Sequence, residues 1–223
     1  MIKKKTLIFL EDIKANNDRE WFHANKDYFN AANNNMKAFL ESLKDEMNKF
    51  DEIEKTKLFR IYRDIRFSKD KTPYKSHFSM SMSRAGNLRR GGYYLRITPG
   101  ETVAVCGFFN PEPKDLKLIR DNIALDDKPL RKVLSLKKIK DLFNGLEGDQ
   151  VKTSPKGFSK EHPAIDLLRY KQFFLKRHFK DAEVKDKNFM KEVVKTYKAV
   201  GPFFNYMTDI LTHDLDGVPL YKA

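Results

Sequence analysis

Residues 74–83 alternate between two kinds of side chain, and this period of two constrains the fold more than any other feature of the chain. Large apolar side chains recur at even positions, including Tyr74, Phe78, Met80 and Met82, whereas every odd position is polar. Such alternation predicts a β-strand with one buried face and one solvent-exposed face.

Two further strands are predicted directly after the first. Residues 84–92 form a turn rich in glycine, and residues 93–98 have strand character. Thr98–Glu101 fits a type II turn, because proline occupies its second position and glycine its third. The third strand, residues 102–109, is apolar on both faces and should be central. The three strands predict an antiparallel meander.

Helical patterns precede the meander. The first apolar stripe ends near Asn16, and Asp18 is a good N-cap for the next helix. That second helix carries an apolar residue at every seventh position as far as Phe50. Asn33–Asn35 are weak helix formers, so they would kink the helix or divide it.

The second half of the chain predicts mainly helices. Its expected elements are helices at 114–123 and 129–143, irregular chain at 144–162, a short helix at 163–170, a strand at 171–179, and two closing helices separated by Gly201 and Pro202. No linker or repeat interrupts residues 1–223, which predicts a single domain. The expected class is α+β: an antiparallel sheet, with a meander of at least three strands plus a later strand, packed by N-terminal and C-terminal helices.

The net charge is +13, from 44 basic and 31 acidic residues, and it favours polyanionic partners such as nucleic acid or phosphorylated metabolites. The lysines are spread along the chain, so a general bias towards lysine explains the charge equally well. One cysteine fits a reducing compartment, and no run approaches the roughly 20 apolar residues of a membrane span. We therefore expect a cytoplasmic protein without a membrane partner.

Standard catalytic and cofactor motifs are absent. The chain has no GxGxxG, Walker A, GxSxG, HExxH or CxxC pattern, and none of its five histidines pairs at i, i+4. We expect no metal site and no cofactor. Cys106 falls in the predicted central strand, where a buried, inert thiol is expected.

The turn RAGNLRRGG at 84–92 has two interpretations. Its glycine backbone amides with Arg84, Arg89 and Arg90 would cradle a phosphate. Hairpin loops need glycine in any case, which favours an ordinary solvated turn. For a nucleic-acid partner this turn would be the best placed, because Tyr93 and Tyr94 follow it and would stack on bases.

The stretch RIYRDIRFSKDKTPY at 60–74 carries an arginine at every third position. It fits a helix or a strand, and its β-branched and aromatic content, with Thr72 before Pro73, favours the strand. In a strand, Arg60, Asp64 and Arg66 share one face. Arg63 then lies on the apolar face and needs a buried partner.

Three functional interpretations of this stretch remain open. In the preferred one, a phosphate- or carboxylate-bearing ligand binds in an arginine-lined pocket. The candidate ligand-binding residues are Arg60, Arg63, Asp64, Arg66, Lys71 and Tyr74. The alternatives are an enzyme acting on a phosphorylated or nucleotide substrate, and a nucleic-acid-associated binding module. In the enzyme, Asp64 would be the base and Tyr74 or His77 the acid, although neighbouring arginines should lower the pKa of Asp64.

A fourth interpretation of this stretch is structural. Arg63 and Asp64 would belong to a buried ion-pair network, and loss of one partner of such a pair costs about 3–5 kcal/mol. Arg63→Ala would then lower the melting temperature sharply.

The same stretch resembles the bacterial and fungal family known as domain of unknown function 2461, whose signature is R-x-x-R-D-x-R-F-x-x-x-K-x-x-Y. Every fixed position matches: Arg60, Arg63, Asp64, Arg66, Phe67, Lys71 and Tyr74. Residues 9–29, GGYYLRITPG and PKGFSKEHPAIDLL also look like this family. The resemblance implies a single-domain bacterial protein and brings no reaction or catalytic residues with it.

Overall fold

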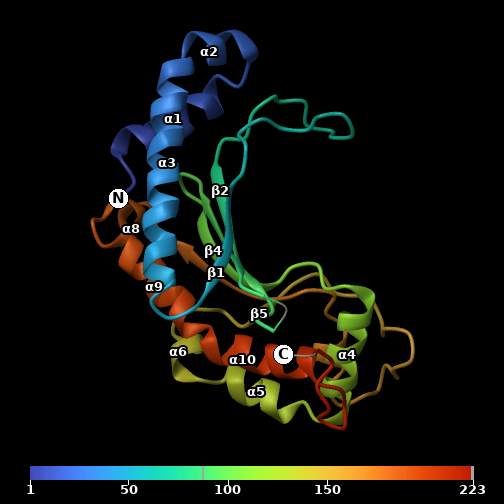
Figure 1. The fold of residues 1–223 in the computed structure, drawn as a ribbon. Helices are drawn as coiled ribbons and strands as arrows, with labels where there is room; N and C mark the ends of the chain where they lie inside the picture. The colour runs from blue at the N-terminus through green and yellow to red at the C-terminus, as the bar shows by residue number, and fades with distance from the viewer. Residues whose placement is uncertain (87, 222–223) are drawn as a thin grey trace. The chain divides into compact units, whose positions relative to one another are not determined.

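A computed structural model describes residues 1–86 and 88–221 (Figure 1). Its helices are α1 (Lys4–Ala15), α2 (Arg19–Ala24), α3 (Lys26–Met47), α4 (Pro113–Leu125), α5 (Lys128–Leu134), α6 (Lys137–Lys140), α7 (Ile165–Leu168), α8 (Asp181–Lys185), α9 (Phe189–Ala199) and α10 (Gly201–Thr212). Its strands are β1 (Ile53–Leu58), β2 (Phe78–Arg84), β3 (Gly92–Ile97), β4 (Thr102–Phe108), β5 (Leu146–Glu147) and β6 (Phe173–Phe179).

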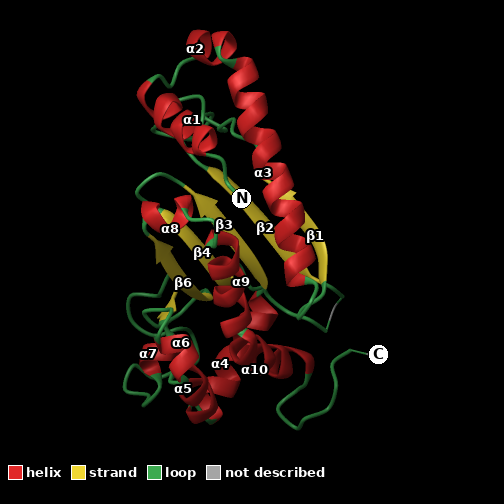
Figure 2. Ribbon diagram, turned by 90° about the vertical axis from the view of Figure 1, so that its left-hand side faces the viewer, coloured by secondary structure: helices red, strands yellow, loops and turns green. Residues whose placement is uncertain are grey.

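The strands form one six-stranded sheet in the order β1-β2-β3-β4-β6-β5 (Figure 2). The α+β class and the antiparallel meander are thereby confirmed. β4 lies between β3 and β6 and is buried along its whole length, as its double apolar face predicts. β5 was not expected: it pairs antiparallel with β6, with Leu146 opposite Leu175.

Two compact units can be distinguished within the chain. Unit 1 comprises residues 1–83, 94–104 and 178–195, and unit 2 comprises 84–93, 105–177 and 196–223. Each unit is described by itself. None of the described helices is long and apolar enough to cross a membrane.

Unit 1 has an aromatic core beneath its N-terminal helices, where α3 packs on α1 and β1. Phe9 and Phe78 are fully buried with ring centroids 6.2 Å apart, and Trp21 lies 6.3 Å from Phe9. Asp18 caps α2 as predicted, because its side chain accepts a hydrogen bond from the Trp21 amide at 2.8 Å.

The long N-terminal helix is divided, but not at Asn33–Asn35. The break falls at Asn25, whose amide side chain caps α2 by donating to the Trp21 carbonyl at 2.9 Å. Asn35 instead lies within α3 and binds the start of the chain: its Oδ1 accepts from the Lys3 amide and from the Thr6 hydroxyl, both at 2.8 Å. These two hydrogen bonds offset the weak helix propensity of Asn35.

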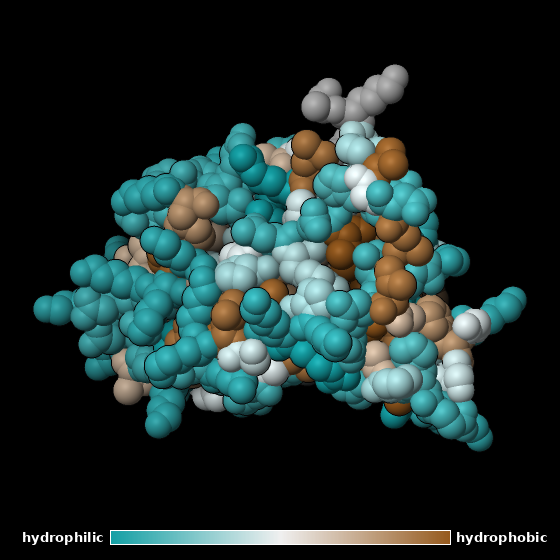
Figure 3. All heavy atoms as spheres, turned by 90° about the horizontal axis from the view of Figure 1, so that it is seen from below, coloured by the Kyte–Doolittle hydropathy of each residue, from teal (hydrophilic) through white to brown (hydrophobic). Residues whose placement is uncertain are grey.

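Unit 2 is built around α10, which packs against α4 and α5. Phe203 and Phe204 of this helix are buried against Phe108, with ring centroids 6.2 and 6.0 Å away. Hydrophilic side chains cover most of the face shown in Figure 3, with apolar ones between them.

Candidate functional site

Residues 59–77 form a loop rather than the predicted strand. Tyr62 and Tyr74 make an isolated antiparallel bridge, and the loop runs out from it in teal in Figure 1. Two backbone bonds close its base: the Arg63 amide donates to the Pro73 carbonyl at 2.9 Å, and the Lys75 amide to the Ile61 carbonyl at 2.8 Å. The strand prediction fails because charged side chains dominate residues 63–71 and keep that segment in water.

Arg63 braces the loop from inside. Its Nη1 pairs with the Asp70 carboxylate and donates to the Thr72 hydroxyl at 2.9 Å. Asp70 also accepts from the Thr72 amide at 2.9 Å and from its hydroxyl at 2.7 Å. The prediction that Arg63 has a buried partner is thus wrong, because the side chain of Asp70 is 53% exposed.

The side chains of Asp64, Arg66 and Lys71 all form hydrogen bonds within the loop. The Arg66 guanidinium donates to Asp64 through Nε at 2.9 Å and through Nη2 at 2.6 Å, and Lys71 Nζ donates to the Ile65 carbonyl at 2.9 Å. The bond from Arg66 lowers the pKa of Asp64, and this opposes a role for Asp64 as a general base. Asp64 and Arg66 are exposed, so no buried network includes them.

Tyr74 fastens the loop to the N-terminal helices. Its ring stacks on Phe22 at 4.0 Å between centroids, and its backbone exchanges two hydrogen bonds with the Asn17 side chain, at 2.9 and 3.1 Å. Burial raises the pKa of the Tyr74 phenol, so it stays protonated.

A cavity of about 430 Å³ opens at the base of the loop, and we call it the Arg63 cavity. It is lined by Lys14, Asn17, Arg63, Asp70, Thr72, Tyr74, Lys75, Ser76 and His77. Of the six candidate residues, only Arg63 and Tyr74 line it; Arg60, Asp64, Arg66 and Lys71 are not among its lining residues.

Seven of the nine lining residues lay outside the predicted ligand-binding set, and three of these have basic side chains: Lys14, Lys75 and His77. Lys75 and His77 occupy polar positions of the alternating stretch; His77 was considered only as an acid in the enzyme alternative, and Lys75 only as part of a solvent-exposed face. Lys14 comes from the last turn of α1, and no local sequence signal connects it to the loop.

The Arg63 cavity has a surplus of positive charge. Lys14, Arg63 and Lys75 against Asp70 leave two positive charges, because the loop's hydrogen bonds from Thr72 and then Arg63 hold the pKa of Asp70 at about 2. Within the described residues, neither Lys14 nor Lys75 has a carboxylate partner. Burial, followed by repulsion from Arg60, Arg63 and Lys57, lowers the pKa of Lys75.

His77 is a neutral side chain in this cationic surrounding. Burial is the main cause, and repulsion from Arg96, Lys75 and Arg63 adds to it, so that its pKa falls to about 4. At neutral pH its imidazole therefore offers one donor and one acceptor.

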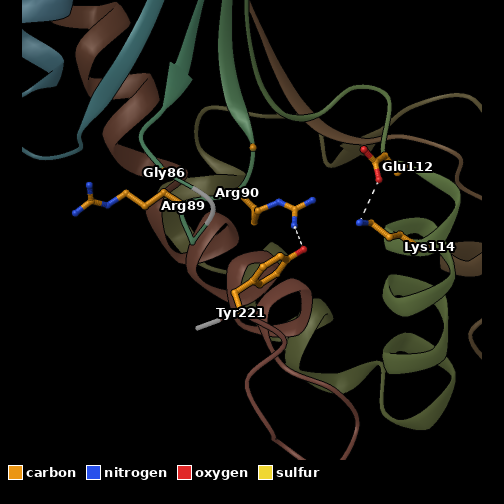
Figure 4. A pocket seen from close by; sticks show the side chains of 7 residues that line it. Gly86, Arg89, Arg90, Glu112, Lys114 and Tyr221 are labelled. Carbon is orange, nitrogen blue, oxygen red and sulfur yellow. Dashed lines mark hydrogen bonds and ion pairs between the residues drawn. The ribbon is translucent and has the colours of Figure 1, made fainter. Parts of the chain in front are cut away.

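A second cavity, of about 420 Å³, lies in unit 2 beside the 84–92 turn (Figure 4). Two of its three cations have carboxylate partners: Arg90 pairs with buried Asp115, and Lys114 lies 3.4 Å from Glu112. Arg90 also donates to the Tyr221 hydroxyl at 3.2 Å, while Figure 4 shows the Arg89 side chain directed away from Arg90. Because Arg90 and Lys114 are already paired with carboxylates and Arg89 is directed away from Arg90, this cavity is the weaker candidate for an anion.

The 84–92 turn is docked on the protein rather than freely solvated. Arg84 donates to the Arg90 carbonyl at 2.8 Å and lies 4.7 Å over the Phe204 ring. Tyr93 is buried against Tyr197 and Phe204, so the prediction that it stacks on bases is wrong. Cys106 is fully buried, and burial raises the pKa of its thiol.

Comparisons with known proteins identify the family. A family model described as "Conserved hypothetical protein (DUF2461)" matches residues 5–206. No curated protein and no solved structure matches the chain.

Proposed function

The chain belongs to DUF2461, a family of conserved hypothetical proteins, and we propose that the Arg63 cavity binds the phosphate group of a small anionic ligand. The observation that carries this proposal is the surplus of two positive charges from Lys14, Arg63 and Lys75 against Asp70. A phosphate monoester carries a charge of about −1.5 to −2 at neutral pH and matches that surplus, whereas a carboxylate carries only −1.

The cavity also offers the directed donors that a phosphate needs. Both guanidinium bonds of Arg63 within the described residues leave from Nη1, so Nε and Nη2 remain to bind phosphate oxygens side by side. The Ser76 hydroxyl and the neutral imidazole of His77 line the same space. A volume of about 430 Å³ falls within the range of small-molecule sites, roughly 300–1,000 Å³, and leaves room for an organic group beyond the phosphate.

Inorganic phosphate and phenyl phosphate are suitable probes, with the His77 imidazole resonance as the readout. We expect each probe to raise the pKa of His77 above its value of about 4, because a bound anion offsets the neighbouring cations. Lys14→Gln should weaken binding by about tenfold without harming the fold, because the Lys14 side chain is exposed and forms no hydrogen bond within the described chain.

Lys114→Gln is the matched control, because it removes the same charge from the second cavity. It should leave phosphate affinity unchanged. Equal weakening by the two substitutions, or an unaltered His77 titration at saturating phosphate, would contradict the proposal.

The enzyme alternative now depends on His77 rather than Asp64. His77 is the one cavity side chain with a titratable nitrogen that is neutral at pH 7, among the lining residues described. If the protein hydrolyses phosphomonoesters, His77→Gln should abolish turnover of p-nitrophenyl phosphate while phosphate still binds. Turnover that survives this substitution would exclude that mechanism.

A further inference from the structure

The loop at 62–74 carries an aromatic ring that the fold does not use. Phe67 is 96% exposed, although most neighbouring side chains have structural partners. Arg63, Asp64, Arg66, Asp70 and Lys71 each bind another part of the loop.

We infer that this loop binds a single-stranded nucleic acid with a terminal phosphate, the phosphate occupying the Arg63 cavity and a base stacking on Phe67. The inference rests on the proposed function, since it identifies the ligand of the same cavity. A terminal phosphate is a monoester and has the dianionic charge that the cavity matches, whereas each internal phosphodiester carries a single charge.

Phe67 lies on a part of the loop whose two sides are joined by hydrogen bonds. The internal hydrogen bonds fix the loop on both sides of it, from Arg63 to Thr72 and from Lys71 to Ile65. Because the backbone that carries the exposed ring is already braced, binding costs less conformational freedom and more of the stacking energy is retained. Stacking of one base on one aromatic ring is sequence-tolerant, because every base has a π-face.

The charges around Phe67 suit a phosphate backbone. Between residues 60 and 75 the cations are Arg60, Arg63, Arg66, Lys69, Lys71 and Lys75, and the acids are Asp64 and Asp70. This excess accompanies the net charge of +13 of the whole chain.

The cavity and the ring are close enough for one strand to contact both. Phe67 is separated by four peptide units from Arg63 and by three from Asp70, and both of these residues line the cavity. Even fully extended, those connections span at most about 14 and 11 Å.

A single strand fits these features better than a duplex or a membrane. Bases in a duplex are stacked on one another and do not present a free face to a protein ring. Membrane binding scales with buried apolar area, and a single exposed ring supplies little.

Fluorescence anisotropy with a short oligothymidylate, labelled at the end opposite its phosphate, tests the inference. We expect a phosphorylated strand to bind at least tenfold more tightly than its hydroxyl-ended counterpart, with separate strands for 5′ and 3′ phosphate. Phe67→Ala should weaken binding by about tenfold, and Phe67→Trp should restore it. Leu125→Ala, which removes another exposed apolar side chain, is the control and should have no effect.

The design separates this inference from the proposed function. Phe67→Ala should leave the affinity for inorganic phosphate unchanged, whereas Lys14→Gln should weaken both ligands. If phosphate binds but the oligonucleotide does not, or if Phe67→Ala binds the strand as wild type does, the inference is overturned and the phosphate site stands. If strand binding depends on Phe67 but not on the terminal phosphate or Lys14, the assignment of the cavity fails. Phe67-dependent binding to anionic lipid vesicles without oligonucleotide binding also overturns the inference.

Discussion

Arg63 connects the stability of the motif loop with its proposed function. Its side chain is 28% exposed and its partner Asp70 is 53% exposed, so solvent screens their attraction. The energetics of a buried ion pair therefore do not apply at this position. Under the proposed function, the main contribution of Arg63 is to supply donors to the ligand within the cavity.

Arg63→Ala should consequently lower the melting temperature by less than about 4 °C while it abolishes phosphate binding. Thermal unfolding followed by circular dichroism, with phosphate titration of the same variant, measures both effects. Arg66→Ala, which breaks a pair outside the cavity, should have a similarly small thermal effect and retain phosphate binding. A fall of ten degrees or more in Arg63→Ala alone would support the structural interpretation instead.

His77 makes stability depend on pH. The pKa of His77 in the folded protein is about 4, below the ordinary value of 6.5. Between these two pH values the unfolded chain therefore binds a proton at His77 and the folded protein does not. The free energy of unfolding should fall as the pH drops from about 6.5 to about 4. Below about pH 4, His77 should cause no further fall. Urea unfolding across that range should show a smaller fall for His77→Gln, and an identical pH dependence would argue against a neutral, partly buried imidazole.

At the level of secondary-structure elements, the docked 84–92 turn depends on one glycine. Gly91 has φ of +89°, and a Cβ at this position would lie 2.5 Å from Cε1 of Phe204. Gly86, in the same turn, has φ of +69° and open space around it. A substitution at Gly86 therefore tests the cost of the positive φ alone, whereas one at Gly91 adds the cost of the collision with Phe204.

Gly91→Ala should destabilise the protein by about 2–4 kcal/mol, because a positive φ and a collision with Phe204 act together. Gly86→Ala carries only the backbone cost, about 1 kcal/mol. Urea denaturation of both variants gives the comparison. Equal losses would mean that Phe204 yields and that the turn is not closely packed on α10.

Periodic elements could be predicted from the sequence, whereas aperiodic ones could not. Alternation and helical stripes located β2, β3 and β4, the closing helices α9 and α10, and the cap at Asp18. β1 was missed because only Ile53 of this edge strand is buried, and β5 because two residues become a strand only by pairing with β6.

The lining of the Arg63 cavity could likewise be predicted only in part. Arg63 and Tyr74 were predicted because the motif is compact in sequence. Lys14 could not be predicted, because only the packing of α1 brings it to the cavity. The side-chain bonds that turn residues 62–74 into a loop run between residues of no regular spacing, so no periodic pattern announces them.

At the level of the whole molecule, the path of the chain bears on how it unfolds. Each compact unit is assembled from three separate stretches of sequence, so neither is a continuous piece of chain. A discontinuous unit cannot complete its core until distant segments have arrived. On this ground we predict that residues 1–223 unfold as a single domain.

We therefore expect one calorimetric unfolding transition, with equal calorimetric and van't Hoff enthalpies. A fragment of residues 1–104 lacks the third stretch of unit 1 and should remain unfolded by circular dichroism and one-dimensional NMR. Two resolved transitions, or a folded fragment, would show that the units are separate domains.

The aromatic core of unit 1 also provides a spectroscopic reporter. Trp21 is the only tryptophan of the chain, and its ring lies beside that of Phe9. Trp21 belongs to α2, and the next residue of this helix, Phe22, stacks on Tyr74 of the Arg63 cavity. Intrinsic emission excited at the red edge of indole absorption therefore reports on one location, with no second indole to obscure it. Ligand titrations can be followed on the unlabelled, natural chain through the colour and intensity of that single emitter.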